Sequence, residues 1–294
     1  MFRTVFTLMT AGLVLTLSPA AAAQDAPAVQ TGYAPVNGLE MYYEIHGAGK
    51  PLIVIHGAYM TIESMGAIIP RLAESRQVIA VELQGHGRTA DIADRPLRFE
   101  ALAEDIDALM AHLNIETADI FGFSLGGGVA LQVALRHPER VNKLILVSSG
   151  YNSQGWYPEM YAFIDQITPE LFVGSPMEAE YQRLAPNPEN FGTLVTKLTE
   201  LTKAVQDVSP DEIRAIQAPT LVMVGDADNI RPEHALDLYK LRGGGVPGDI
   251  VGAPASQLAI IPGATHVTII DRVDALTMFT NEFLDAAPPA PPTQ

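Results

Sequence analysis

The 294-residue sequence contains no cysteine. Disulfide bonds, a thiol nucleophile and lipid attachment at a cysteine are therefore excluded. No cluster of residues has the spacing of zinc ligands, since there is neither an H-E-x-x-H pattern nor a cysteine pair. No G-x-G-x-x-G stretch follows a predicted strand, so a dinucleotide site is not indicated. We therefore expect no metal and no cofactor.

Lysine and arginine are also scarce, with 18 of them against 34 aspartates and glutamates, for a formal net charge of −16. An excess of negative charge repels polyanions, which argues against nucleic acid and anionic membranes as partners. The charge is best explained as a solvated acidic surface and does not indicate a reaction. We expect the partner to be a small, neutral or weakly charged molecule.

Long hydrophobic runs are absent except near the N-terminus, where residues 5–17 follow Arg3 and precede the small residues 21–23. This arrangement is typical of a cleavable signal peptide, here residues 1–23. The run is shorter than the ~20 residues that span a bilayer, so we expect cleavage rather than a membrane anchor. The sequence thus predicts an exported bacterial protein, periplasmic or secreted.

Hydrophobic residues make up 48% of the chain, enough for one α/β core with an inserted subdomain. Strands buried on both faces, each followed by a helical pattern, are predicted from continuous apolar runs at 51–55, 78–83, 120–123, 141–147 and 220–224. This alternation predicts a doubly wound, mostly parallel sheet formed by residues 36–150 and 210–285.

The remaining segments lack this alternation of strands and helices. Residues 151–209 carry the single tryptophan and several prolines, and we expect them to form a small, mostly helical cap with helices near 158–167 and 191–207. Residues 24–35 and 286–294 are rich in proline and alanine. We expect a flexible leader and a disordered tail there.

The segment Gly122-Phe123-Ser124-Leu125-Gly126 lies where a predicted strand runs into a predicted helix. A G-x-S-x-G pattern in this context is a nucleophile elbow, in which a strained serine presents its Oγ above the sheet and flanking glycines allow close backbone approach. The alternative is a glycine-rich turn with an idle serine. The flanking strand and helix favour the nucleophile.

Active sites of open α/β sheets form at the carboxyl ends of the strands, and other predicted strands end close to Asp228, His266 and Ala58. Acyl transfer by a serine needs an imidazole to accept its proton, a carboxylate to orient the imidazole, and two fixed N–H donors. We predict Ser124 as nucleophile, His266 as general base and Asp228 as its partner. The backbone N–H groups of Ala58 and Leu125 are the predicted oxyanion hole.

From about Gly38 to Leu284 the chain resembles the α/β-hydrolase superfamily, whose serine members place their triad in the order Ser, Asp, His. The resemblance is carried by the elbow and by four further motifs, His56-Gly57, Gly85-His86-Gly87, His137-Pro138-Glu139-Arg140-Val141 and Pro262-Gly263-Ala264-Thr265-His266. The elbow is similar to those of serine esterases and cofactor-free haloperoxidase-like hydrolases. Glu82 and Thr89 depart from the Asp and Ser that the family more often shows beside the Gly-His-Gly turn.

The resemblance also bears on the choice between two aspartates. In the family the acid typically lies four residues before a proline, as Asp228 lies before Pro232, whereas Asp226 lies six before. Asp228 is therefore preferred, and Asp226 stays open as the alternative.

The predicted reaction is hydrolysis of a carboxylic ester, including lactones and aryl esters, through an acyl-enzyme. Hydrolysis of a carbon–carbon bond by the same triad is one alternative, and a catalytically silent ligand-binding protein is another. An apolar substrate pocket is predicted from Tyr59, Met60, Trp156, Tyr157, Met160, Tyr161 and Val267. The aromatic residues of the cap fit the core of the cap itself equally well.

Overall fold

The structure, a computed structural model, describes residues 28–204 and 206–287. The predicted signal peptide and residues 288–294 of the predicted tail lie outside the described residues. Ala286, the first residue of that tail, accepts a hydrogen bond from Lys143 at 2.7 Å. Within the described ranges, no helix combines the length and the apolar character that crossing a membrane requires.

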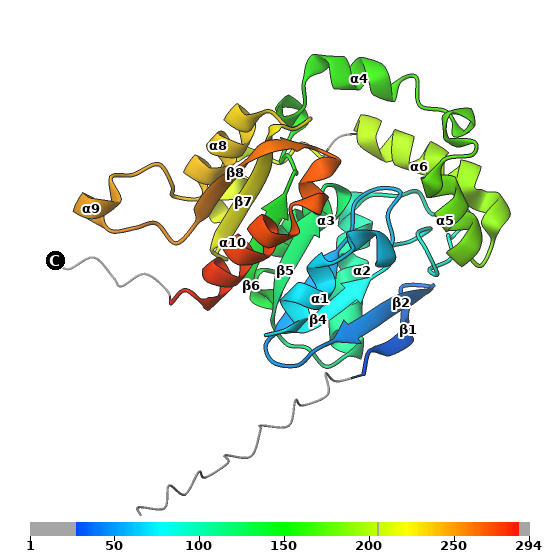
Figure 1. The fold of residues 1–294 in the computed structure, drawn as a ribbon, viewed down its shortest axis with the longest axis horizontal. Coiled ribbons are helices and arrows are strands. Elements are labelled where there is room, and N and C mark those ends of the chain that lie inside the picture. The colour runs from blue at the N-terminus through cyan, green and yellow to red at the C-terminus, as the bar shows by residue number, and fades with distance from the viewer. Residues whose placement is uncertain (1–27, 205, 288–294) are drawn as a thin grey trace, which may run out of the picture.

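One mixed sheet forms the centre of the molecule (Figure 1), with the strand order β1-β2-β4-β3-β5-β6-β7-β8. β1 pairs antiparallel with β2, and β2 with β4, whereas the other neighbours are parallel. The predicted mostly parallel α/β sheet is thereby confirmed. The strands are β1 (Gln30–Val36), β2 (Leu39–His46), β3 (Pro51–Ile55), β4 (Gln77–Val81), β5 (Ala118–Phe123), β6 (Val141–Val147), β7 (Thr220–Ala227) and β8 (Gln257–Thr265).

Helices connect the strands and cover both faces of the sheet. They are α1 (Ile68–Ala73), α2 (Phe99–His112), α3 (Leu125–Arg136), α4 (Pro158–Ile164), α5 (Pro176–Leu184), α6 (Phe191–Ala204), α7 (Pro210–Ala215), α8 (Pro232–Leu241), α9 (Gly248–Val251) and α10 (Val273–Asp285). Short 3₁₀ turns lie at Glu63–Met65, Pro138–Arg140, Ser153–Gly155, Pro169–Phe172, Pro188–Asn190 and Thr268–Asp271.

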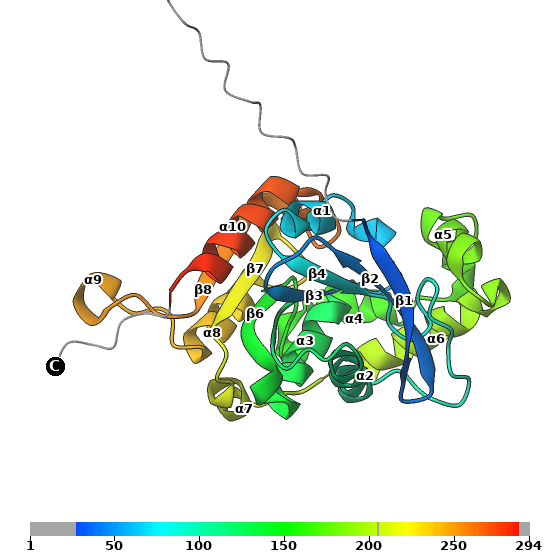
Figure 2. The ribbon, with the colours of Figure 1, turned by 90° about the horizontal axis from the view of Figure 1, so that it is seen from below.

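The hydrophobic core has two halves, one on each face of the sheet. Alternate residues of a strand point to opposite faces. In β3, Ile53 and Ile55 therefore pack with α2, α3 and α8, whereas Leu52 and Val54 pack with α1 and α10. Figure 2 shows these two groups of helices on opposite sides of the sheet. Burial on both faces explains why the central strands are continuous apolar runs.

The prediction of a flexible leader over residues 24–35 is wrong for residues 30–35. These residues form most of β1, which pairs with β2 along its whole length and buries Ala34 and Val36. Their proline and alanine content was misleading, because an edge strand tolerates Pro35 where a central strand would lose a hydrogen bond of the sheet.

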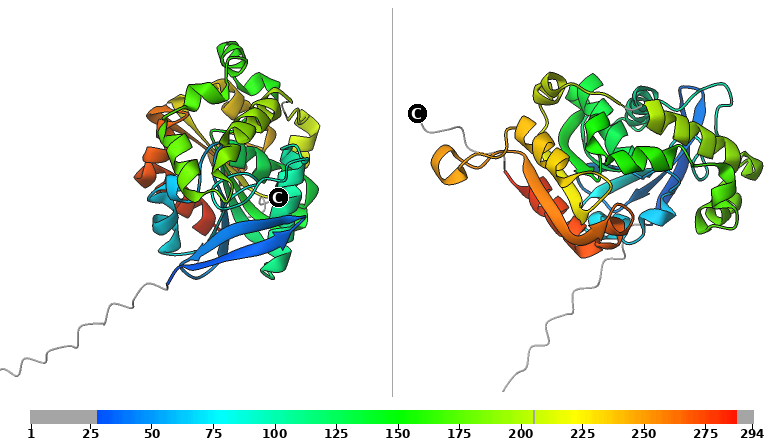
Figure 3. Two further views of the ribbon diagram at one scale, coloured as in Figure 1. Left: turned by 90° about the vertical axis from the view of Figure 1, so that its right-hand side faces the viewer. Right: turned by 90° about the horizontal axis from the view of Figure 1, so that it is seen from above.

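The predicted cap, residues 151–209, contains α4, α5 and α6 in the structure, and these helices lie together over one end of the sheet (Figures 1 and 3). α6 is fastened to the core by Lys197, which is nearly buried. Its Nζ lies 2.7 Å from a carboxylate oxygen of Asp91 and donates hydrogen bonds to the carbonyls of Ile92, Ala93 and Arg95 at 2.8, 3.0 and 3.0 Å. This anchor places one face of α6 over the carboxyl ends of the strands.

Candidate active site

Ser124 occupies a strained turn between β5 and α3, with φ 52° and ψ −112°. A residue other than glycine at positive φ costs on the order of 1–3 kcal/mol and persists where its surroundings enforce it. Here the amide of Ser124 donates to the carbonyl of Val147 at 2.9 Å. A Cβ on Gly122 would lie 2.2 Å from the carbonyl oxygen of Gly126, and one on Gly126 would lie 2.2 Å from that of Ile55. Glycine at both positions is what lets the elbow form.

Three side chains that are distant in the sequence meet at this turn. Oγ of Ser124 lies 2.9 Å from Nε2 of His266, and Nδ1 of His266 lies 2.8 Å from Oδ1 of Asp228. The strand pairing explains the second contact, because Ala227 and Thr265, the last residues of β7 and β8, are opposite each other. The structure thus brings the three predicted catalytic residues into hydrogen-bonding contact in the order that proton transfer from the serine requires.

Asp228 is buried and accepts hydrogen bonds at both oxygens. Oδ1 accepts from the amide of Ile230 at 2.9 Å, and Oδ2 accepts from the hydroxyl of Ser148 at 2.5 Å and the amide of Gly225 at 3.3 Å. Burial by itself raises the pKa of Asp228, but the hydrogen bond and charge of His266, with the amide and hydroxyl donors, lower it below its usual value. The ionised carboxylate holds a proton on Nδ1, which leaves Nε2 free to accept one from the serine.

Ser148 is a site residue that the sequence analysis did not identify. It follows the last residue of β6, has φ 51°, and its amide donates to the carbonyl of Met223 at 2.8 Å. The available signal was its position after a predicted buried strand, at the same edge of the sheet as the triad. The alternative acid, Asp226, is exposed, and its carboxylate accepts from the amide of Gly263 at 2.8 Å instead of contacting His266.

Two backbone amides border the cavity beside Ser124, those of Leu125 and Ala58. Leu125 is the first residue of α3, where an N–H group has no partner within the helix and carries the positive end of the helix dipole. Ala58 lies in the loop that follows β3, the neighbour of β5. Within the described residues, neither amide donates to a protein acceptor. The two predicted oxyanion-hole donors are therefore available to a bound oxygen.

The loop carrying Ala58 is braced by two buried histidines. Nδ1 of His56 lies 2.7 Å from the carbonyl of Gly57, and its Nε2 accepts from the amide of Leu83 at 3.2 Å. His86 accepts from the amide of Tyr59 at 3.3 Å. Burial lowers the pKa of His56 to about 3 and that of His86 to about 4, so both stay neutral. They support the loop and do not reach the serine.

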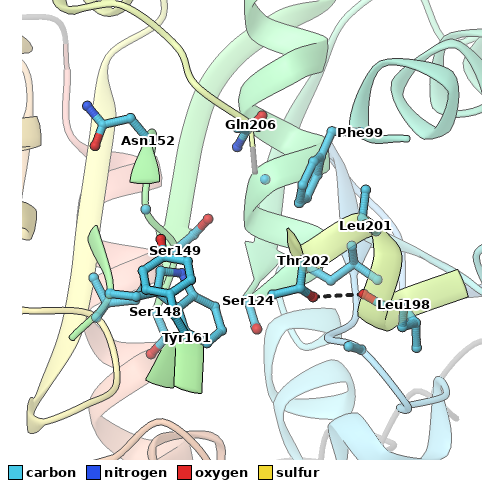
Figure 4. Close-up of a pocket in the computed structure, with 16 residues that line it drawn as sticks. Phe99, Ser124, Ser148, Ser149, Asn152, Tyr161, Leu198, Leu201, Thr202 and Gln206 are labelled. Carbon is cyan, nitrogen blue, oxygen red and sulfur yellow. Dashed lines mark hydrogen bonds between the residues drawn. The ribbon is translucent and has the colours of Figure 1, made fainter. Parts of the chain in front are cut away.

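Two cavities meet at Ser124. The larger, of about 370 Å³, is lined by the predicted pocket residues Tyr59, Met60, Trp156, Met160 and Val267. The smaller, of about 110 Å³ (Figure 4), is lined by Trp156 and the predicted Tyr161. Leu198 and Thr202 of α6 line both cavities and were not predicted.

The prediction for Tyr157 is wrong. Its side chain is 39% exposed and lines neither cavity. Tyr157 is the extended residue immediately before Pro158, which begins α4. The turn at this helix start directs the ring of Tyr157 outward, whereas the ring of the preceding Trp156 lies 5.9 Å from that of His266.

The charges around the cavities limit what can bind. Glu180 lines the larger cavity, and among the described residues neither cavity is lined by a lysine or an arginine. Across the part of the chain that the structure describes, no group of three or more histidine, aspartate or glutamate side chains is arranged to hold a metal ion. The site therefore combines the predicted nucleophile, base and oxyanion donors, and the described residues around it include no lysine or arginine for an anionic ligand.

Comparison with known proteins gives matches of three kinds. A family model described as the alpha/beta hydrolase fold matches residues 50–273. Pimeloyl-[acyl-carrier protein] methyl ester esterase of Pectobacterium carotovorum subsp. carotovorum (strain PC1) is 30% identical over 259 residues, 81% of this chain and 95% of the esterase. The solved structure of 2-hydroxy-6-oxo-6-phenylhexa-2,4-dienoate hydrolase from Rhodococcus sp. strain RHA1 aligns with a TM-score of 0.66 and 23% identity, covering 88% of this chain and 99% of that one.

Other curated relatives have a higher sequence identity to this chain, but over shorter segments. 2-Hydroxymuconate semialdehyde hydrolase of Pseudomonas sp. (strain CF600) is 40% identical over 106 residues, which is 35% of this chain and 38% of that hydrolase. The chain spans 33% to 38% of the length of the first curated relatives. The relatives thus include one enzyme named as a methyl ester esterase and another named as a semialdehyde hydrolase.

Proposed function

Because the chain belongs to the α/β-hydrolase family, whose model matches residues 50–273, we propose that it is a serine hydrolase of carboxylic esters, including lactones and aryl esters. The observation that carries the proposal is the 2.9 Å contact between Ser124 Oγ and His266 Nε2, with Asp228 on the other ring nitrogen. A serine activated in this way is a nucleophile for carbonyl carbon. The full-length esterase relative supports the ester as the bond that is cleaved.

The reaction proceeds in two halves. Ser124 Oγ attacks the carbonyl carbon while its proton moves to Nε2 of His266, and the carbonyl electron pair moves onto oxygen beside the amides of Ala58 and Leu125. The bond to the leaving oxygen then breaks, and Nε2 gives its proton to that oxygen, which releases the alcohol. Water repeats the sequence: its proton goes to Nε2, its oxygen bonds to the acyl carbon, and Oγ leaves with the proton.

Hydrolysis of a carbon–carbon bond is the second candidate, and it is supported by the semialdehyde hydrolase relative. The dienoate named for the Rhodococcus enzyme is an anion. An anion placed in either cavity here would find no lysine or arginine among the described lining residues, and in the larger cavity it would find Glu180. Burying a charge without a partner is unfavourable, so this charge distribution supports a neutral ester over an anionic substrate.

Hydrolysis of a neutral aryl acetate, followed in a pH-stat, tests the proposal. We expect Ser124→Ala to lower kcat on the order of 10⁶-fold while the protein stays folded by circular dichroism. In the same assay the Rhodococcus enzyme's dienoate should be a far poorer substrate than the ester. Faster turnover of the dienoate would favour the carbon–carbon hydrolase, and full activity of Ser124→Ala would contradict both.

Export is a separate proposal that depends on the sequence of residues 1–23. We propose that these residues are removed during secretion and that the mature chain begins at Gln24. Expression of the full chain in a bacterium, followed by fractionation and intact-mass measurement, tests it. A mass that includes residues 1–23 in the cytoplasmic fraction would contradict export.

A further inference from the structure

We propose that the two cavities at Ser124 divide the ester between them, with the acyl group in the smaller cavity and the leaving alcohol in the larger one. The preferred substrates are then esters of short acids with bulky, apolar, uncharged alcohols. This assignment rests on the proposed ester hydrolysis and names the substrate class of the same site.

The position of His266 assigns the leaving group. Nε2 of His266 must protonate the leaving oxygen when the tetrahedral intermediate collapses, so the alcohol has to lie beside the imidazole. His266 lines the larger cavity, together with Val267 and Ile270, and does not line the smaller one. The larger cavity is therefore on the leaving-group side of Ser124.

The smaller cavity is left for the acyl substituent. The four groups on the tetrahedral carbon are Oγ, the oxyanion, the leaving oxygen and the acyl chain. With the oxyanion against the amides of Ala58 and Leu125 and the leaving oxygen at His266, the acyl chain takes the remaining direction. Leu125 lines the smaller cavity and not the larger, which places the acyl chain on the side of the α3 N-terminus.

The difference in volume sets the preference for a short acyl group. The smaller cavity has about 110 Å³ and the larger about 370 Å³, so the acyl side has less than a third of the room. Its lining includes Phe99 and Gln206, which Figure 4 labels together with Ser124. A Cβ added to Gly128 would lie 2.4 Å from the Phe99 ring, and Gln132 donates to the side-chain carbonyl of Gln206 at 3.0 Å. These contacts hold both side chains beside the smaller cavity.

Phe99 is the residue that limits acyl length. A further cavity of about 190 Å³ shares Phe99, Leu201 and Gln206 with the acyl cavity and does not include Ser124. Phe99, the first residue of α2, therefore borders both spaces. Removing the ring joins them and gives a longer acyl chain a place to extend.

The larger cavity suits an apolar alcohol. Its lining includes Met60, Met160, Phe163 and Met177, and the last two are 52% and 40% exposed. Its one carboxylate, Glu180, accepts a hydrogen bond from the hydroxyl of Thr61. Exposed apolar side chains leave room for a bulky group to extend toward solvent. The described residues of this lining include no lysine or arginine to pair with an acidic alcohol.

Two isomeric esters test the assignment on the unaltered protein. Benzyl acetate carries its ring on the alcohol, and methyl phenylacetate carries it on the acid, with the same atoms in total. We expect kcat/KM for benzyl acetate to be higher on the order of 10- to 100-fold, because the ring fits only the leaving-group side. Equal values, or a preference for methyl phenylacetate, would overturn the assignment while leaving ester hydrolysis intact. Turnover of neither ester would overturn the proposed function, and the assignment with it.

Variants of two phenylalanines, Phe99 and Phe163, locate the two sides. Phe99→Ala should shift the preference among p-nitrophenyl acetate, butyrate and octanoate toward the longer acyl chains by at least about tenfold relative to acetate. Phe99→Leu, which keeps more of the packing, should give a smaller shift in the same direction. Phe163→Ala is the same change on the alcohol side. It should leave the acyl preference unchanged and alter the ratio of kcat/KM for benzyl acetate to kcat/KM for ethyl acetate. An unchanged acyl preference in both Phe99 variants would contradict the role of Phe99.

Discussion

Two buried carboxylates at the same edge of the sheet have opposite ionisation behaviour. Asp228 follows β7 and Glu82 follows β4, and both side chains are inaccessible to solvent. Burial is the largest influence on each and by itself raises both pKa values. The pKa of Asp228 is nevertheless lowered, whereas that of Glu82 is raised to about 7.

The difference lies in what surrounds each carboxylate. Asp228 receives the imidazole of His266, the hydroxyl of Ser148 and two backbone amides. Glu82 receives the backbone amide and guanidinium of Arg88, at 2.5 and 2.9 Å, and a long hydrogen bond of 3.4 Å from the amide of Ile62. At Asp228 the hydrogen-bond donors lower the pKa by more than burial raises it, and at Glu82 they lower it by less. The ionisation of each of these buried carboxylates is therefore decided by its hydrogen-bond donors and not by burial alone.

The two carboxylates also have different tasks. Asp228 orients the imidazole of His266. Glu82 holds the turn after β4 against the loop after β3, and a Cβ on Gly87 would lie 2.3 Å from its carboxyl carbon. The sequence comparison marked Glu82 as a departure from the family pattern, and the structure gives this longer side chain a structural role beside the oxyanion loop.

Among the variants that compare the two carboxylates, we expect Asp228→Asn to have the largest effect on kcat. The amide cannot hold the required proton on Nδ1 of His266, so we expect kcat for an aryl acetate to fall about 10⁴-fold. Asp226→Asn is the matched control, the same chemical change at an exposed residue two positions away. Its kcat should equal that of the unaltered protein, and a loss as large as that of Asp228→Asn would show that the triad is assigned to the wrong aspartate.

Ser148→Ala tests how much one donor matters to Asp228. A hydrogen bond to a charged group contributes about 1.5–3 kcal/mol to stability, so we expect the free energy of unfolding to fall by about that amount. The carboxylate that loses this donor has a higher pKa and binds the imidazolium more strongly, so the acid limb of the kcat/KM profile should move to higher pH. A lower rate with an unmoved limb would indicate only a packing role for Ser148.

Glu82→Gln tests the other carboxylate through stability. The pKa of Glu82 is raised from 4.5 to about 7 on folding, so its contribution to stability is fully present below pH 4.5 and is lost as the pH rises through about 7. By linkage the loss is on the order of 3 kcal/mol. Glutamine does not titrate and therefore removes this dependence on pH. In urea unfolding, the free energy of unfolding of Glu82→Gln should increase relative to that of the unaltered protein as the pH rises from 4.5 to about 7.

The direction in which stability changes with pH distinguishes the two carboxylates. For Asp228, whose pKa is lowered, the contribution is present above its unfolded value of 3.8 and is lost as the pH falls through the folded value. A constant difference in free energy between Glu82→Gln and the unaltered protein, from below pH 4.5 to above pH 7, would contradict the account of Glu82.

The triad could be predicted from the sequence because each residue follows a buried strand. Parallel strands bring their carboxyl ends to one edge, so Ser124, Asp228 and His266 come together whatever the loops between them do. Ser148 follows a strand as well, but its hydrogen bond depends on φ 51° at that one residue, which the sequence does not specify. A serine after a strand is otherwise indistinguishable from an ordinary loop serine.

The cap and the edges of the sheet were harder to predict for a different reason. Which face of α6 meets the cavities depends on Lys197 binding the loop around Asp91, 106 positions earlier in the chain. Local periodicity carries no information about such a contact. At the edges, Pro35 lies inside β1, a strand that composition alone assigns to a leader, and Pro262 lies inside β8. Edge strands accept proline, so composition misleads there.

Covalent labelling with a fluorophosphonate, read by intact mass and peptide mapping, tests the central claim most directly. The account predicts one label per chain, located on Ser124, with complete loss of ester hydrolysis. It also predicts no label on Ser124→Ala and much slower labelling of Asp228→Asn than of Asp226→Asn. A label on any other residue, or undiminished labelling of Ser124→Ala, would contradict a nucleophile at the end of β5.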